Sequence, residues 1–167
     1  MIEEGHNEAT AGAFMAMTGL LSIAAGPLWG WLSDQWGRSN ALTTALVLVT
    51  LAMELPLVDQ SLVTFFLHFL IMGLSVNGMF ALIQASATDQ VAPRYIPIAF
   101  SFVTVFFALG QLVGPAVTGW FIESSGGFRA AFGFTFVVLL AGAYLTLKIR
   151  QFPAEYAVGA TTPPADP

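Results

Sequence analysis

The sequence predicts an all-α membrane protein with five transmembrane helices. Hydrophobic residues make up 56% of the 167 residues and charged residues only 9%, and the mean hydropathy is +0.76. A soluble domain carries about 25% charged residues, so this chain has too few to build a surface in contact with water. Five long apolar stretches occupy most of the sequence, and backbone groups in lipid are satisfied only in helices or closed barrels.

The expected spans follow from the lengths of these stretches, because a helix needs roughly 20 apolar residues to cross the hydrocarbon core. They cover residues 11–32, 41–58, 62–86, 97–122 and 130–149. Segments rich in polar residues, Gly or Pro separate them, beginning with a polar turn expected over 34–40. Residues 1–10 form an N-terminal tail, and the Pro- and Ala-rich residues 151–167 are expected to be a disordered tail.

The distribution of basic residues predicts an orientation in the membrane. With five spans, one side holds Arg38, Arg94, Lys148 and Arg150, and the other side holds only Arg129. Because basic loops stay in the cytoplasm, we expect the N-terminus outside and the C-terminus in the cytoplasm. The N-terminal tail is then extracytoplasmic and the C-terminal tail cytoplasmic.

Several classes of function are excluded by what the sequence lacks. It has no cysteine, hence no disulfide, thiolate metal site or cysteine nucleophile. It has no phosphate loop, metal-ligand cluster or nucleophile–base arrangement, so we expect neither an enzyme nor a cofactor or nucleic-acid partner. No Lys or Arg precedes Arg38, and a cleavable signal peptide begins with basic residues.

The run from Gly26 to Arg38 carries the most specific motif. It resembles the cytoplasmic loop signature of the major facilitator superfamily, a large group of secondary transporters. The matching residues are Gly30, Leu32, Asp34, Gly37 and Arg38, whereas Gln35 and Ser39 stand where that family usually has basic residues. The signature lies in the loops after the second and eighth helices of such transporters.

A second motif supports the same resemblance. Residues 110–115, followed by Gly119, resemble the Gly-rich fifth or eleventh helix of such transporters, and also the YbfB/YjiJ-like branch of the superfamily. The segments 26–34 and 114–123 resemble each other as well, and they run in opposite directions across the membrane. An inverted repeat of this kind is typical of transporters built from three-helix units.

The resemblance implies a function and an incomplete architecture. Residues 11–150 would be part of an MFS-type helical bundle, either helices two to six or helices eight to twelve, and the tail and the weakened signature favour eight to twelve. We expect a multi-pass protein of the cell membrane that moves a small solute by alternating access together with a missing N-terminal half. The alternative is a truncated or non-transporting membrane protein, or a subunit that assembles with another half.

The resemblance also implies a conformational latch at the cytoplasmic face. In the family, the Asp of the signature pairs with basic groups and with a helix N-terminus, where a carboxylate is favoured. The implied latch comprises Gly30, Asp34, Gly37, Arg38, Asp89 and Arg94. The alternative is that these charges are solvated loop residues that set topology.

Small residues and prolines indicate faces for close packing or gating. The residues concerned are Gly19, Gly26 and Pro27 in the first span, and Gly110, Gly114, Pro115 and Gly119 in the fourth. Small residues at helical spacing let helices approach closely in lipid, and a proline removes one helical hydrogen bond. Such faces meet either the opposite transporter half or neighbouring helices of the same half.

Polar residues at membrane depth are the candidates for a substrate path. Asn77 and Gln84 lie seven residues apart and share a helix face, and Gln111 lies near the middle of the fourth span with Thr104 on its face. Their alternative role is to hydrogen-bond neighbouring helices.

For His68 a packed or interfacial role is preferred to a proton relay. Tryptophans near the span ends, Trp29 among them, are expected in the interfacial belt.

Overall fold

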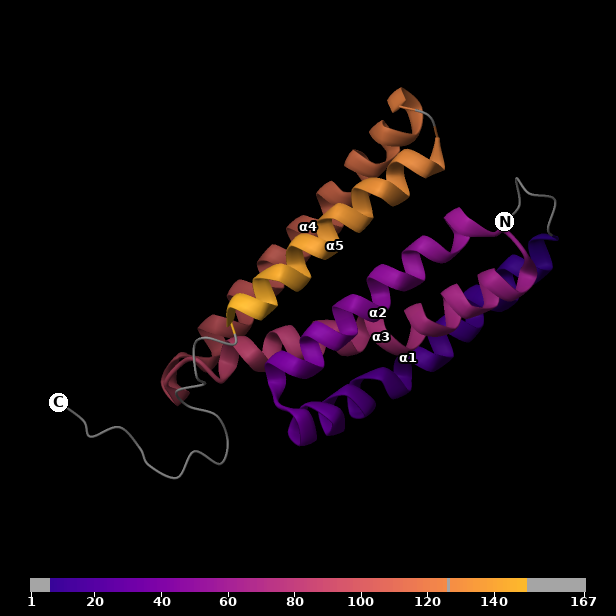
Figure 1. Cartoon of the computed structure of the whole chain (residues 1–167). Coiled ribbons are helices and arrows are strands. Elements are labelled where there is room, and N and C mark those ends of the chain that lie inside the picture. Colours follow the sequence, from indigo (N-terminus) through magenta and orange to yellow (C-terminus); the bar gives the residue numbers. More distant parts are fainter. Residues whose placement is uncertain (1–6, 126, 150–167) are drawn as a thin grey trace.

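The computed structural model describes residues 7–125 and 127–149, and these fold into five long helices and one short one (Figure 1). The elements are α1 (Glu8–Trp36), α2 (Arg38–Val58), α3 (Leu62–Thr88), the 3-10 helix η2 (Pro93–Tyr95), α4 (Ile96–Ser125) and α5 (Phe128–Ile149). All five α-helices are long and apolar enough to cross a membrane. The predicted fold class, an all-helical protein with five candidate spans, is confirmed.

The helices extend further into the polar segments than the sequence suggested. Only Gly37 separates α1 from α2, where a turn over residues 34–40 is expected. The flanking segments 1–6 and 150–167 lie outside the described residues, and with them the expected disorder of the C-terminal tail.

Local capping explains where two of the helices begin. The Asn7 side chain accepts a hydrogen bond from the Ala9 amide at 2.8 Å at the start of α1. At the start of α3, the Ser61 hydroxyl accepts one from the Thr64 amide at 3.3 Å. Both follow the preference for short polar side chains at helix N-caps. Hydrogen bonds from the Ser61 and Thr64 hydroxyls lower the pKa of Asp59, which lies in the turn before α3.

Two glycines of α3 allow α1 to approach it closely. A Cβ atom added to Gly78 would lie 2.0 Å from Cδ1 of Trp29, and one added to Gly73 would lie 3.0 Å from backbone atoms of Thr18. The Trp29 indole, only 3% exposed, also donates to the Leu74 carbonyl at 2.7 Å. Trp29 therefore belongs to the α1–α3 interface, and its expected place in an interfacial belt is wrong.

The core joins α1, α2, α3 and α5. Its buried residues are Ala25, Trp29, Ala41, Leu42, Ala45, Leu46, Leu82 and Ala143. Helix α5 packs on α2 through small and hydroxylated side chains, with Thr43 and Thr146 hydroxyls 2.9 Å apart. Hydroxyl pairs of this kind are common between membrane helices, where apolar packing excludes no water.

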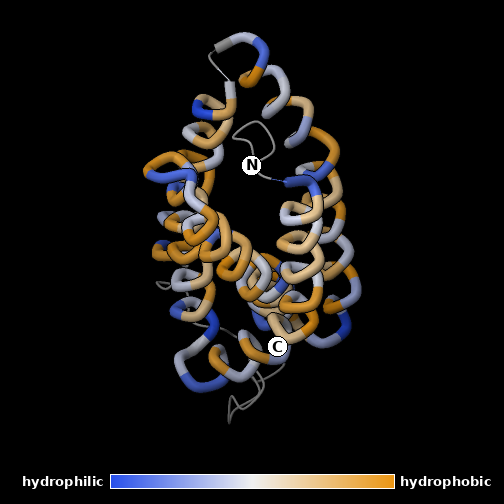
Figure 2. Tube along the Cα trace, turned by 90° about the vertical axis from the view of Figure 1, so that its right-hand side faces the viewer, coloured by the Kyte–Doolittle hydropathy of each residue, from blue (hydrophilic) through white to orange (hydrophobic). Residues whose placement is uncertain are grey.

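Helix α4 lies at the periphery of the bundle. It runs beside α5, and the pair diverges from the other three helices toward the α4–α5 turn (Figure 1). No residue in the most apolar stretch of α4 is buried inside the structure. Apolar residues cover the helices along their length, and the most hydrophilic ones lie mainly near helix ends (Figure 2). The surface of α4 thus remains available to lipid or to another protein segment.

Candidate functional site

The break between α1 and α2 depends on the conformation of a single glycine. Gly37 adopts φ 84° and ψ 148°, a region that is essentially restricted to glycine. Its amide donates to the Ser33 carbonyl at 2.9 Å, and its carbonyl accepts from the Ala41 amide at 3.1 Å. One residue therefore ends α1 and starts α2, which turns Arg38 back toward the last turn of α1.

Arg38 is the centre of an ion-pair cluster at this end of the bundle. Its Nε donates to Asp89 Oδ2 at 3.1 Å, and its Nη1 donates to Asp34 Oδ1 at 3.2 Å. Nη1 also donates to the Ser33 hydroxyl, which in turn donates to the Gly30 carbonyl at 2.8 Å. We call Ser33, Asp34, Arg38 and Asp89 the Arg38 cluster. It connects α1, α2 and the end of α3.

The two acidic residues of the cluster differ strongly in burial. The Asp89 side chain is 12% exposed and the Asp34 side chain is 70% exposed, while that of Arg38 is 33% exposed. An exposed ion pair contributes little because water and salt screen it. The Arg38–Asp89 contact is therefore the stronger of the two, although the signature motif pointed to Asp34.

The charges of the cluster lie at helix ends that disfavour them. Arg38 is the first residue of α2, and Asp89 caps the C-terminus of α3. The helix dipole favours acidic groups at N-termini and basic groups at C-termini, the reverse of what is seen. The mutual attraction of Arg38 and Asp89 offsets this cost, so each residue depends on the other.

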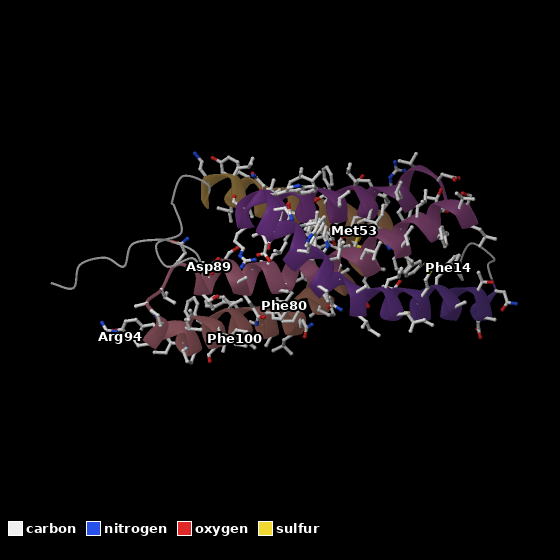
Figure 3. The ribbon with its side chains drawn as sticks, turned by 90° about the horizontal axis from the view of Figure 1, so that it is seen from below. Phe14, Met53, Phe80, Asp89, Arg94 and Phe100 are labelled. Carbon is white, nitrogen blue, oxygen red and sulfur yellow. The ribbon has the colours of Figure 1, made fainter. Side chains whose placement is uncertain are left out.

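Arg94 does not join the cluster. Its guanidinium lies over the Tyr95 ring at 4.8 Å, and among the described residues it forms no ion pair. It lies at the edge of the molecule, away from Asp89 (Figure 3). The resemblance also implies a contact of Asp34 with a helix N-terminus. The Asp34 carboxylate pairs with the Arg38 side chain, and among the described residues no backbone amide donates to it.

The candidate substrate-path residues lie along the contact between α3 and α4. Gln84 donates to the Thr104 hydroxyl at 3.3 Å, and the rings of Phe80 and Phe107 lie 4.0 Å apart, with Phe80 between the two ribbons (Figure 3). Asn77 lies one turn from Phe80 on α3, and Gln111 one turn from Phe107 on α4.

The spacing along both helices matches, since α3 presents residues 77, 80 and 84 and the antiparallel α4 presents 111, 107 and 104. Asn77 and Gln111 thus occupy facing register positions beyond the aromatic pair. Both are exposed, and within residues 7–125 and 127–149 neither forms a side-chain hydrogen bond. By contrast, Gln84 and Thr104 bond each other, as the alternative role predicts.

The glycines expected on packing faces lie in open space. Apart from chain neighbours and the backbone of the same helix, no atom comes within 4 Å of a Cβ built on Gly19, Gly26, Gly110, Gly114 or Gly119, and the same holds for Gly30 of the signature. Pro27 and Pro115 are exposed as well. The close approach between helices uses Gly73 and Gly78 of α3 instead. The small-residue faces of α1 and α4 are therefore not used for packing within the described part of the chain.

One member of the Arg38 cluster was missed at the level of sequence. Ser33 lies on one buried face of α1 with Ala25 and Trp29, at intervals of four residues, and this spacing was the signal that could have found it. The structure also buries Glu54 Oε1 and Ser86 Oγ without a hydrogen-bond partner among the described residues.

The fold and the cluster define a multi-pass helical membrane protein whose helix ends are joined by buried and exposed ion pairs. The family model described as the Major Facilitator Superfamily matches residues 1–165. The chain belongs to the major facilitator superfamily, which is a family of transporters and not of enzymes. No solved structure gives a significant match.

Individual relatives agree with this assignment. The chain is 30% identical over 148 residues to vacuolar basic amino acid transporter 1 of Saccharomyces cerevisiae, covering 88% of this chain and 26% of that protein. It is 31% identical to the uncharacterized MFS-type transporter YfkF of Bacillus subtilis, over 73% of this chain and 31% of the relative. It is 29% identical to multidrug resistance protein MdtG of Klebsiella pneumoniae, over 87% of this chain and 35% of that protein. The chain thus spans about a quarter to a third of the length of these relatives.

Proposed function

We propose that this chain forms helices eight to twelve of a secondary transporter that moves a small solute across the membrane by alternating access. The N-terminal half of that transporter would come either from a separate chain or from a segment contiguous with this one. The observation that carries the proposal is the pair of open, glycine- and proline-containing faces on α1 and α4. Their occupant would be the opposite half, against which these helices rock.

The inverted repeat supports the same view of α4. Segment 26–34 of α1 corresponds to segment 114–123 of α4, and α1 packs on α3 through Gly73 and Gly78. If the inverted repeat were complete, the helix that corresponds to α3 in the other repeat unit would pack on α4 as α3 packs on α1. Within the described residues α4 has no such partner, which is consistent with its lack of buried residues.

The prolines of α1 and α4 favour a polar environment at these faces. Pro27 and Pro115 deprive the carbonyls of residues 23 and 111 of their helical donors. In the described residues no side chain from another helix donates to either carbonyl. Interrupted helices of this kind point to the substrate path of transporters. Asn77 and Gln111, at facing positions between α3 and α4, are the amides best placed to bind a solute there.

The Arg38 cluster is proposed to act as a latch on the cytoplasmic side. Arg38, Arg94 and Lys148 all lie at the end where α1 meets α2, and Arg129 lies at the opposite end, which favours the orientation with the C-terminus inside. The opposed helix dipoles keep the net stability of the cluster small. A contact of small net stability is suited to breaking and re-forming between two conformations.

Cross-linking in native membranes tests the partner. The chain has no cysteine, so Gly26→Cys and Gly114→Cys introduce single thiols on the open faces, and Leu82→Cys is the buried control. We expect both glycine variants, and not the control, to cross-link to a second transporter segment. A homodimer, or no product at all, would favour the alternative of a non-transporting protein.

Thiol accessibility tests the substrate path. A hydrophilic maleimide is expected to label Asn77→Cys and Gln111→Cys in native membranes, because a thiol reacts as the thiolate in water. Val47→Cys, which is 44% exposed on α2, should remain unlabelled in lipid. Equal labelling at the three positions would contradict the assignment.

Reconstitution tests whether this chain is sufficient. We expect vesicles that contain the chain alone to show no saturable solute uptake, because alternating access needs two halves. Saturable uptake by the chain alone would overturn the proposal. In a complete family member with the same signature, Asp34→Asn is expected to shift the balance of inward- and outward-facing states, and unchanged accessibility would leave Asp34 as a topology residue.

A further inference from the structure

Pro56 interrupts the backbone hydrogen bonding of α2 close to the α2–α3 turn. In a regular α-helix the amide of residue 56 would donate to the carbonyl of Ala52, and proline has no amide proton. The pattern resumes immediately, since the Asp59 amide donates to the Leu55 carbonyl at 3.2 Å. Pro56 therefore deprives the Ala52 carbonyl of its helical donor.

His68 of α3 supplies a donor to this carbonyl. Its Nδ1 lies 2.7 Å from the Ala52 oxygen, and the ring packs edge-on against Phe69 with centroids 5.0 Å apart. Ala52 is 0% exposed and His68 is 9% exposed, so solvent has little access to the bond. A buried carbonyl without a partner is costly, and the histidine removes that cost.

We propose that His68 replaces the amide proton that Pro56 lacks, and thereby fixes the end of α2 to α3. A carbonyl oxygen only accepts, so Nδ1 must carry the proton of this bond. His68 is a positioning residue, and the alternative of a proton relay is not needed to explain its burial.

The other two helix prolines show what distinguishes Pro56. Pro27 and Pro115 lie on exposed faces, whereas Pro56 is buried in the α2–α3 contact. Membrane proteins tolerate prolines in helices when neighbouring groups satisfy the freed carbonyls. In the described part of the chain a side chain from a neighbouring helix does this only for Pro56.

A double-mutant cycle tests the exchange of donors. In detergent, His68→Ala should lower the folded-to-unfolded ratio of the full chain both by the loss of ring packing and by about tenfold from the buried acceptor that is left unpaired. Pro56→Ala restores an amide proton, so in that background only the packing loss remains and the same substitution should cost about tenfold less. The cycle cancels the packing loss at Pro56. Equal costs in both backgrounds would overturn the proposal.

Two controls sharpen the cycle. Pro27→Ala, which restores an amide far from His68, should leave the full cost of His68→Ala unchanged. His68→Asn keeps a donor nitrogen on Cγ at the position of Nδ1, and it should retain the ratio within about twofold. A loss with His68→Asn as large as with His68→Ala would show that ring packing alone matters.

A spectroscopic measurement covers the case in which the variants fail to fold. The chain has two histidines, His6 and His68, so ¹⁵N-histidine NMR of a His6→Asn chain reports on His68 alone. We expect Nδ1 to be protonated and hydrogen-bonded in the neutral ring. An unprotonated Nδ1 in the neutral ring would overturn the proposal, whatever the stability data show.

Discussion

The Arg38 cluster leads to a quantitative prediction, because its two acidic partners have nearly equal distances to Arg38 but very different burial. The contacts measure 3.1 Å to Asp89 and 3.2 Å to Asp34, with side-chain exposures of 12% and 70%. Distance alone would predict that Asp89 and Asp34 contribute equally to the stability of the cluster. Solvent screening predicts that Asp89 contributes most of the stability of the cluster.

The magnitudes follow from the environment of each pair. A hydrogen bond to a charged group that is largely buried is worth about 1.5–3 kcal/mol, so the coupling between Arg38 and Asp89 should be about 2 kcal/mol. An exposed pair separated by four residues on neighbouring turns contributes about 0.5 kcal/mol or less, which is the value expected for Arg38 and Asp34. The hydrogen bond from the Arg38 guanidinium to the Ser33 hydroxyl does not involve either aspartate, so Asp89→Asn and Asp34→Asn both leave its donor and acceptor in place.

Two double-mutant cycles measure these couplings. Each combines Arg38→Gln with either Asp89→Asn or Asp34→Asn, and the free energy of unfolding is followed by tryptophan fluorescence during SDS titration in mixed micelles. Asp59→Asn, in the turn at the other end of α2, is a charge-matched control with no expected coupling to Arg38. A coupling to Asp34 equal to or larger than that to Asp89 would refute the ranking by burial.

Two further predictions concern the α1–α3 interface and the α2–α3 turn. Gly78→Ala should destabilise the chain by about 3 kcal/mol, since its Cβ would lie 2.0 Å from Trp29, whereas Gly26→Ala should be neutral or stabilising by up to about 1 kcal/mol; thermal unfolding of both variants checks this. The lowered pKa of Asp59 means that its stabilising hydrogen bonds persist above the ordinary aspartate pKa and are lost as pH falls below about 4. A lower protection factor of the Thr64 amide at low pH, after division by its intrinsic exchange rate, would show the loss, and Asp59→Asn should abolish this pH dependence.

The number and identity of the helices could be predicted from the sequence because lipid leaves few alternatives for long apolar stretches. The Arg38 cluster was partly predictable, since the signature pointed to Asp34 and Arg38 and the order of the spans brought Asp89 to the same end. The relative strength of its two ion pairs could not be predicted, because the burial of Asp89 depends on how the end of α3 packs against α2. The one-residue turn at Gly37 depends on a backbone conformation that polarity does not indicate.

The role of small residues shows a further limit of prediction from sequence. Gly26 and Gly78 are both helical glycines in apolar stretches, and spacing alone favours Gly26 as a packing residue. The structure packs Trp29 against Gly78 and leaves Gly26 open. The difference arises from which helix lies opposite each glycine, and this is a long-range property that no local pattern contains.

The three prolines extend this argument to function. Each one frees a carbonyl, and the cost of that carbonyl in an apolar environment is the same in all three helices. Beside Pro56 the cost is removed within the chain by His68, so that site is structurally complete. Beside Pro27 and Pro115 no side chain from another helix within residues 7–125 and 127–149 removes it, and both prolines lie on exposed faces that also carry glycines. The described residues leave those two carbonyls open to donors from water or from another segment, which is the environment that the proposed interface between two transporter halves would provide.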